Sequence, residues 1–217
     1  KDGKFTIYKN RYALPAGYTY TGYMTRSDYE KLSPLERQQA LLQCVVLPDD
    51  QVEKMEGQLT ETKPQLSTQE VPWSLKKEQD AKLKDNAIVV KKAGGSVTLT
   101  FAGAADCETY VYFKDLEMEQ SPKEDCTMTV SGNGVSKKTD LYREGSLYTF
   151  QRDGVTFNLG YSADGVKQCK ITFDEKGTYT FDTLQVVCLP MTDYVRDVTA
   201  LSEVTMEDAK EEAGSVS

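Results

Sequence analysis

Short runs of alternating apolar and polar residues fill the chain between positions 71 and 190. A period of two indicates strands that bury one face. Because no helical pattern separates these runs, they are typical of an antiparallel sandwich. We predict a mainly β fold, an antiparallel, jelly-roll-like β-sandwich over residues 71–190. Its strands are expected near residues 72–76, 87–91, 96–102, 107–116, 126–130, 136–141, 147–151, 155–161, 167–174, 177–181 and 184–189.

Glycine-containing turn signals separate the predicted strands: Gly-Gly at 94, Gly-Asn-Gly at 132 and Asp-Gly at 153 and 164. The two Asp-Gly pairs lack the spacing of a calcium-binding EF-hand loop. We therefore interpret them as hairpin turns, in which glycine supplies a positive φ.

Residues 1–48 predict a small strand and helix element packed on the sandwich, with a first strand at residues 4–9. Two Ser-x-x-Glu patterns, Ser27 with Glu30 and Ser33 with Glu36, each fit a capping box at a helix start. Pro34 then stands at a first helical position, where its missing N–H costs nothing. A short amphipathic helix is expected from residue 34 to about 43, followed by a buried strand at 44–47.

The remaining stretches are less regular. Residues 49–70 are polar and lack either period, so we predict a surface excursion there. Residues 191–217 predict a weak helix, with Tyr194, Val198 and Leu201 on one face, and then an acidic tail.

No apolar run exceeds four residues, whereas a membrane helix needs about 20. The chain begins at Lys1 without an initiator Met, which suggests a piece of a longer protein.

Charge and composition narrow the function. The 217 residues carry a formal net charge of -8 without a basic block, which argues against a nucleic-acid surface. The chain has no histidine, which excludes a Ser-His-Asp triad, a Cys-His pair and a histidine-ligated metal within it. Carboxylate runs could form a hydrolase pair, but we interpret them as solvated faces. We predict no catalytic residue, no metal site and no cofactor.

Five cysteines, at 44, 107, 126, 169 and 188, have no C-x-x-C spacing that would indicate a zinc ribbon or a redox motif. Four of them, all except Cys44, stand on the apolar side of alternating segments. A buried thiol behaves as a small hydrophobe, so we interpret these cysteines as free core thiols. One or more disulfides remain an open alternative, and the odd count leaves at least one thiol unpaired within the chain.

Tyrosines concentrate near the N-terminus, where the first thirty residues hold six of the thirteen. Aromatic rings with a polar tip can bind sugar rings or lie at membrane interfaces. We select Tyr18, Tyr20, Tyr23 and the single tryptophan, Trp73, as candidate contacts for a glycan or a partner. The alternative is that these rings pack within the fold, since tyrosine favours strands.

Two segments carry a family resemblance. Residues 10–20 read N-R-Y-A-L-P-A-G-Y-T-Y, and residues 25–43 read T-R-S-D-Y-E-K-L-S-P-L-E-R-Q-Q-A-L-L-Q. They resemble the YfhO-type family of bacterial polytopic membrane proteins. In that family, A-L-P-x-G-Y and L-S-P-x-E-(K/R)-Q-x-A-L-L-Q elements follow a block of transmembrane helices, within the large extracytoplasmic part.

The resemblance implies a membrane-embedded, glycosyltransferase-like core that uses a lipid-linked sugar to glycosylate lipoteichoic acid or a related cell-wall polymer. That core lies outside these residues, so no catalytic residue is carried over. The chain is then expected at the extracytoplasmic face of the cell membrane, as a non-catalytic domain that orients an acceptor glycan or a partner. Its expected partners are the transmembrane part of the same polypeptide and a cell-wall glycopolymer. The alternatives are a structural module that caps the transmembrane core, or a free-standing secreted carbohydrate-binding protein or hydrolase.

Overall fold

The computed structural model describes residues 9–10, 13–14, 18–55, 57, 59–119, 125–142, 154–202, 211–212 and 215–216. The chain forms two compact units, residues 67–191 and residues 1–66 with 192–217. We call them the sandwich unit and the α/β unit. Residues 4–8 of the strand expected at 4–9, the strand expected at 147–151 and the Asp153 turn position lie outside the described residues.

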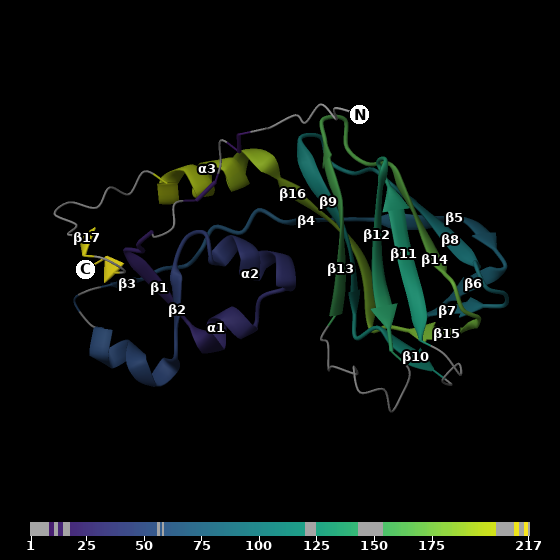
Figure 1. Ribbon diagram of the computed structural model, residues 1–217, viewed down its shortest axis with the longest axis horizontal. Coiled ribbons are helices and arrows are strands. Elements are labelled where there is room, and N and C mark those ends of the chain that lie inside the picture. Colours follow the sequence, from purple (N-terminus) through teal and green to yellow (C-terminus); the bar gives the residue numbers. More distant parts are fainter. Residues whose placement is uncertain are drawn as a thin grey trace. The chain divides into compact units, whose positions relative to one another are not determined.

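The sandwich unit is an antiparallel β-sandwich (Figure 1), which confirms the predicted fold class. A five-stranded sheet has the order β12-β11-β14-β8-β5, and two four-stranded sheets have the orders β13-β9-β16-β4 and β10-β15-β7-β6. The strands are β4 (Gln69–Val71), β5 (Trp73–Gln79), β6 (Ala81–Lys84), β7 (Ala87–Val90), β8 (Ser96–Phe101), β9 (Cys107–Lys114), β10 (Glu117–Glu119), β11 (Cys126–Gly132), β12 (Val135–Leu141), β13 (Gly154–Ser162), β14 (Gln168–Phe173), β15 (Gly177–Thr180) and β16 (Thr183–Pro190).

One apolar core joins these sheets. Alternate residues of each strand point inward, as Val97 and Leu99 do on β8 and Val111 and Phe113 do on β9, and all four are fully buried. All five cysteines are buried free thiols, which confirms the interpretation of the cysteines as small core hydrophobes. The core thus follows from the period-two pattern that predicts the strands.

The turn signals are only partly correct. Asn133 and Gly134, with φ of 52° and 73°, form the two-residue turn between β11 and β12. The hairpin predicted at Asp164–Gly165 is wrong, because this loop connects β13 in one sheet to β14 in another. Gly165 is needed there for space as well as for its φ of 73°, since a Cβ on it would lie 2.0 Å from the carbonyl oxygen of Gly103.

The α/β unit contains a parallel sheet of order β2-β1-β3. The connection from β1 to β2 contains two helices. Parallel strands need such a long crossover connection, because a tight turn can only join antiparallel neighbours. α3 covers the stretch for which the sequence predicts a helix. The elements are β1 (Gly22–Thr25), α1 (Arg26–Glu30), α2 (Pro34–Ala40), β2 (Val45–Leu47), the 3-10 helix η1 (Asp49–Met55), β3 (Thr60–Glu61), α3 (Met191–Ser202), β17 (Glu211–Glu212) and β18 (Ser215–Val216).

The two predicted helix starts have different outcomes. Ser33 caps α2 with a complete capping box, since its Oγ accepts from the Glu36 N–H at 3.4 Å and Glu36 Oε2 accepts from the Ser33 N–H at 2.8 Å. The box predicted at Ser27 is wrong. Thr25 caps α1 instead, because its Oγ1 accepts from the backbone N–H of Asp28 at 3.1 Å.

Replacing Ser33 by alanine is expected to cost about 1 kcal/mol of folding free energy, because the first turn of α2 loses its side-chain acceptor. Chemical unfolding followed by far-UV circular dichroism measures this change. Ser27→Ala is the matched control, and it should leave the midpoint nearly unchanged because Ser27 does not cap α1. Equal shifts for the two variants would contradict this assignment.

Candidate functional site

The three candidate tyrosines belong to the α/β unit and differ in exposure. The Tyr18 ring is 40% exposed and meets Tyr20 edge-on, with 5.6 Å between the ring centroids. The Tyr20 hydroxyl donates to the backbone carbonyl of Leu41, and burial, with a smaller effect of Tyr18, raises the pKa of Tyr20 to about 12. Tyr23 lies in the middle of β1 and is half-buried. Tyr18 therefore presents the most accessible ring of the three.

Trp73, the fourth candidate, belongs to the sandwich unit. Its ring is half-buried against the core, and its indole Nε1 donates to the backbone carbonyl of Leu184 at 2.8 Å. A buried indole usually finds such a partner, and here it joins β5 to β16. Most of the Trp73 ring therefore contributes to packing.

Tyr161 is an exposed aromatic residue that sequence reasoning did not select. At 51% exposure it is the most exposed large apolar or aromatic side chain in the described part of the chain. The register of β13 against β9 shifts between Asn158 and Tyr161, and Gly160 within this bulge has a φ of 80°. A bulge of this kind redirects the side chain that follows it. The signal available in the sequence is Gly160, a glycine inside a strand whose apolar positions alternate.

Hydrogen bonds fix the position of Tyr161. Its hydroxyl donates to Asp106 Oδ1 at 2.7 Å, and this hydrogen bond is the main reason why the pKa of Tyr161 is raised. Its backbone carbonyl accepts from Asn133 Nδ2 at 3.0 Å, while the Asn158 Oδ1 accepts from the Gly160 N–H at 2.6 Å. The ring is therefore exposed and also ordered before any ligand binds.

Polar groups adjoin this ring on the same face of the sheet. Glu108 on β9 stands directly opposite Tyr161, and Tyr110 stands opposite Asn158. Residues paired in this way share a face. The Tyr110 hydroxyl donates to Glu108 Oε2, and Asn158 Nδ2 donates to the Tyr110 hydroxyl oxygen at 3.3 Å. We name Asp106, Glu108, Tyr110, Asn158 and Tyr161 the Tyr161 site.

The Tyr161 site has the chemistry of a polar, ring-shaped ligand. The open face of Tyr161 can pack against the C–H groups of a sugar ring, because the π-face of an aromatic ring is negative and apolar. The carboxylates of Asp106 and Glu108 can accept hydrogen bonds from hydroxyl groups, and the Asn158 amide can donate one. No three metal-ligating side chains gather anywhere in the described residues.

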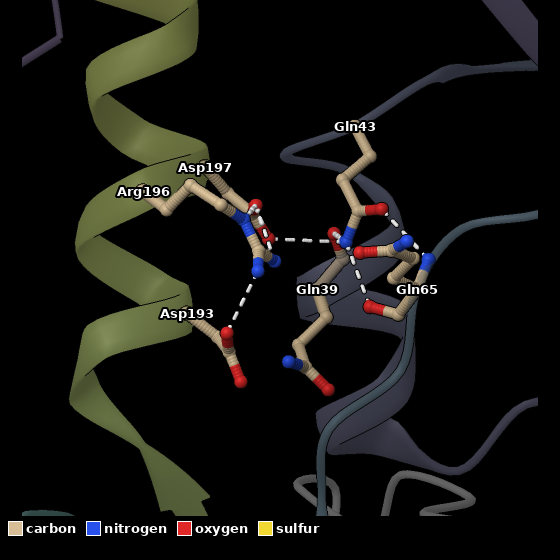
Figure 2. Close-up of polar contacts among 6 residues, drawn as sticks. All are labelled: Gln39, Gln43, Gln65, Asp193, Arg196 and Asp197. Atoms are coloured by element: carbon tan, nitrogen blue, oxygen red, sulfur yellow. Dashed lines mark hydrogen bonds and ion pairs between the residues drawn. The ribbon is translucent and has the colours of Figure 1, made fainter.

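A polar network within the α/β unit links α3 to the residues just after α2 (Figure 2). Gln43 Nε2 donates to Asp197 Oδ2 at 3.0 Å and to the Gln65 carbonyl at 2.9 Å, and Gln43 Oε1 accepts from the Gln65 N–H at 2.7 Å. Asp197 is buried and also accepts from Arg196 Nε at 2.9 Å. A buried carboxylate with these partners stabilises this local arrangement, since its removal would leave donors unpaired.

The segment that carries the family resemblance builds this part of the unit. Ser33 and Glu36 cap α2, and Gln43 is the centre of the network with Gln65 and Asp197. Arg37 Nη2 donates to the Glu30 carbonyl at 2.6 Å, and its guanidinium lies 5.5 Å from the centroid of the Tyr29 ring. The contacts of these motif residues are therefore internal and stabilise the fold of the α/β unit.

Comparison with known proteins assigns the family. The family model of the bacterial membrane protein YfhO matches residues 1–217, and the chain belongs to this family. The resemblance predicted from residues 10–43 is thereby confirmed. None of the described helices combines the length and apolar character needed to span a membrane. No curated protein shows significant similarity to the chain.

Solved structures similar to this chain include three carbohydrate-binding modules. They are the C-terminal family 6 module of a laminarinase from Zobellia galactanivorans (11% identity, TM-score 0.39, covering 56% of this chain and 98% of that one), a family 6 module from Clostridium stercorarium in complex with cellobiose (17%, 0.35, 53% and 89%), and a family 35 module from Cellvibrio japonicus (10%, 0.39, 57% and 93%). Likenesses at such TM-scores assign no ligand to this chain.

Proposed function

We propose that this chain is an extracytoplasmic, non-catalytic domain of a membrane protein related to lipid-linked-sugar glycosyltransferases, and that it binds and orients an acceptor glycan. The acceptor class expected from the family is lipoteichoic acid or a related cell-wall polymer. The observation that carries the glycan-binding part is the Tyr161 ring, which is exposed and fixed by Asp106.

Preorganisation is the physical reason for choosing this site. A ring that is already ordered loses little conformational freedom when a ligand binds, so more of the contact energy appears as affinity. Two carboxylates and an amide at hydrogen-bonding positions supply orientation, as in most small-ligand sites. Tyr18, Tyr20, Tyr23 and Trp73 remain candidate secondary contacts, with Tyr18 the most accessible of them.

A panel of neutral oligosaccharides, screened on an array and then titrated by calorimetry, tests this proposal. Tyr161→Ala should weaken binding of the best oligosaccharide about tenfold or more, which corresponds to about 1.4 kcal/mol. Tyr161→Phe keeps the ring but loses the bond to Asp106, so it should give an intermediate affinity. Tyr194→Ala removes another exposed tyrosine and is the matched control, expected to bind as the unmodified chain does.

Two results would contradict the proposal. If no oligosaccharide of the panel binds, the second candidate function is favoured, a structural module of the membrane protein. The internal contacts of Ser33, Arg37 and Gln43 support this alternative. Binding that is lost in Tyr18→Ala and unchanged in Tyr161→Ala would move the site to the α/β unit.

A further inference from the structure

The outer face of the five-stranded sheet is rich in lysines and hydroxyl groups. One row across this sheet pairs Ser136 with Ser131, Ser131 with Lys170, Lys170 with Thr98, and Thr98 with Lys77. The intervening positions Val97, Val130 and Ile171 are fully buried in the core. Because side chains of a strand alternate between faces, the row points away from the core.

A further lysine stands in the neighbouring row, where Lys138 on β12 pairs with Thr129 on β11. Lys77, Lys138 and Lys170 are all exposed. We name the group Lys77, Thr98, Ser131, Ser136, Lys138 and Lys170 the lysine face. It spans the sheet from β12 at one edge to β5 at the other.

The lysines of this face lack neutralising partners. Among the described residues, ion pairs involve Lys31, Lys92, Lys114 and two arginines, and none of the three lysines of the face. Two carboxylates on this side of the sheet, Asp140 and Asp174, lie at the end of the strands. Asp140 pairs with Thr127 and accepts its hydroxyl at 3.0 Å, and Asp174 Oδ1 accepts from the Thr127 N–H at 2.6 Å. The face is therefore locally positive in a chain whose net charge is -8.

The spacing of the lysines favours a polymer over a small anion. Lys170 on β14 is two strands away from Lys138 on β12 and two strands away from Lys77 on β5. Two inter-strand steps measure about 10 Å, so one phosphate or carboxylate group cannot contact all three ammonium groups. Charges further away are screened, since the Debye length is about 8 Å at physiological ionic strength.

We propose that the lysine face binds a linear polyanion, laid across the strands so that successive anionic groups meet Lys138, Lys170 and Lys77. The hydroxyls of Ser131 and Thr98 lie beside Lys170 in the row. Ser131 Oγ donates to the Lys170 carbonyl at 3.5 Å in the free chain, and when the polymer binds it turns to donate, as Thr98 does, to an anionic oxygen. This surface is separate from the Tyr161 site, which lies on the sheet of β13 and β9. The inference is therefore independent of the proposed glycan contact.

Long-chain inorganic polyphosphate is the probe that tests the proposal. The full chain should bind it with an affinity that falls as salt rises, because each neutralised anion releases a counterion. The triple variant Lys77→Gln, Lys138→Gln and Lys170→Gln should lose about tenfold or more in affinity and show a shallower salt dependence. The matched control Lys82→Gln, Lys84→Gln and Lys91→Gln changes the net charge equally on exposed lysines elsewhere, and it should lose less than about threefold.

Several outcomes would overturn the proposal: no binding of polyphosphate at low salt, equal losses in both triple variants, or binding of orthophosphate at the same affinity per phosphate. Capture by anionic lipid vesicles without binding of polyphosphate would assign the face to a membrane surface instead. Thermal unfolding of each variant verifies that it is folded. Tyr161→Ala should bind polyphosphate normally, so failure of this proposal and failure of the glycan site are distinguishable.

Discussion

Replacing Phe113 by alanine is expected to cost about 3–5 kcal/mol of folding free energy, a large part of the stability of an ordinary domain. Phe113 is fully buried on β9, the strand that pairs with β13 on one side and β16 on the other. Its ring contacts Phe157 and Phe181 edge-on, with 6.3 Å and 5.4 Å between ring centroids. Alanine would leave a cavity beside the rings of Phe157 and Phe181 and remove both edge-to-face contacts.

Urea unfolding measures this loss, and Phe113→Leu, which fills most of the volume, should cost clearly less. Leu75→Ala is the matched control, because Leu75 is 42% exposed and its truncation should change the midpoint little. A Phe113→Ala protein as stable as the Leu75→Ala protein would show that the ring does not belong to the core described above.

Alternation predicts the strands well where one face is buried completely. On β11, Cys126, Met128 and Val130 are all buried while Thr127 and Thr129 between them are not. β6 was missed because three of its four positions (Ala81, Lys82 and Lys84) are small or charged, which leaves Leu83 alone as an apolar signal. The strand forms because β7 supplies its hydrogen bonds, which is tertiary information.

The parallel pairing in the sheet of the α/β unit could not be predicted from the sequence for a similar reason. The run at residues 44–47 predicts a strand, and β2 occupies Val45–Leu47. Nothing local indicates that it pairs in parallel with β1, or that the exposed pair Thr60–Glu61 does so on the other side. When helices separate two strands, tertiary packing determines whether the strands pair, and the local sequence pattern does not indicate it.

The candidate site likewise depends partly on residue types, which the sequence gives, and partly on contacts, which only the fold gives. Tyr18 and Trp73 were selected by residue type, but exposure and hydrogen-bond partners decide how much of each ring is accessible. Tyr161 was inside a correctly predicted strand, and Gly160 was the local sign of its bulge. Its partner Asp106 is 55 residues away in sequence, so the hydrogen bond that fixes the ring follows from the fold alone.

Alkaline pH is expected to destabilise the folded chain steeply, beginning near pH 9. Burial raises the pKa of Cys169 to about 12 and that of Cys126 to about 11, and it also raises the pKa of Tyr179. In the unfolded chain a thiol loses its proton near its ordinary pKa, 9.0. Above that pH the folded state retains more protons than the unfolded state, so the free energy of unfolding decreases as pH rises. Below it both states are protonated, and these thiols contribute no pH dependence.

Cys169→Ala isolates one of these groups, because Cys169, which lies on β14 opposite Leu99 of β8, is almost completely buried and has no ion-pair partner in the described residues. Lysine, tyrosine and the other cysteine titrations are common to both proteins and cancel when their curves are subtracted. Between about pH 9.5 and pH 11 the unmodified chain should lose about 1.4 kcal/mol per pH unit more than the variant, since one proton separates its two states. Urea unfolding at a series of pH values measures both curves. Parallel curves would mean that the Cys169 thiol ionises in the folded protein as readily as in the unfolded one. That result would contradict the burial of this thiol in the core.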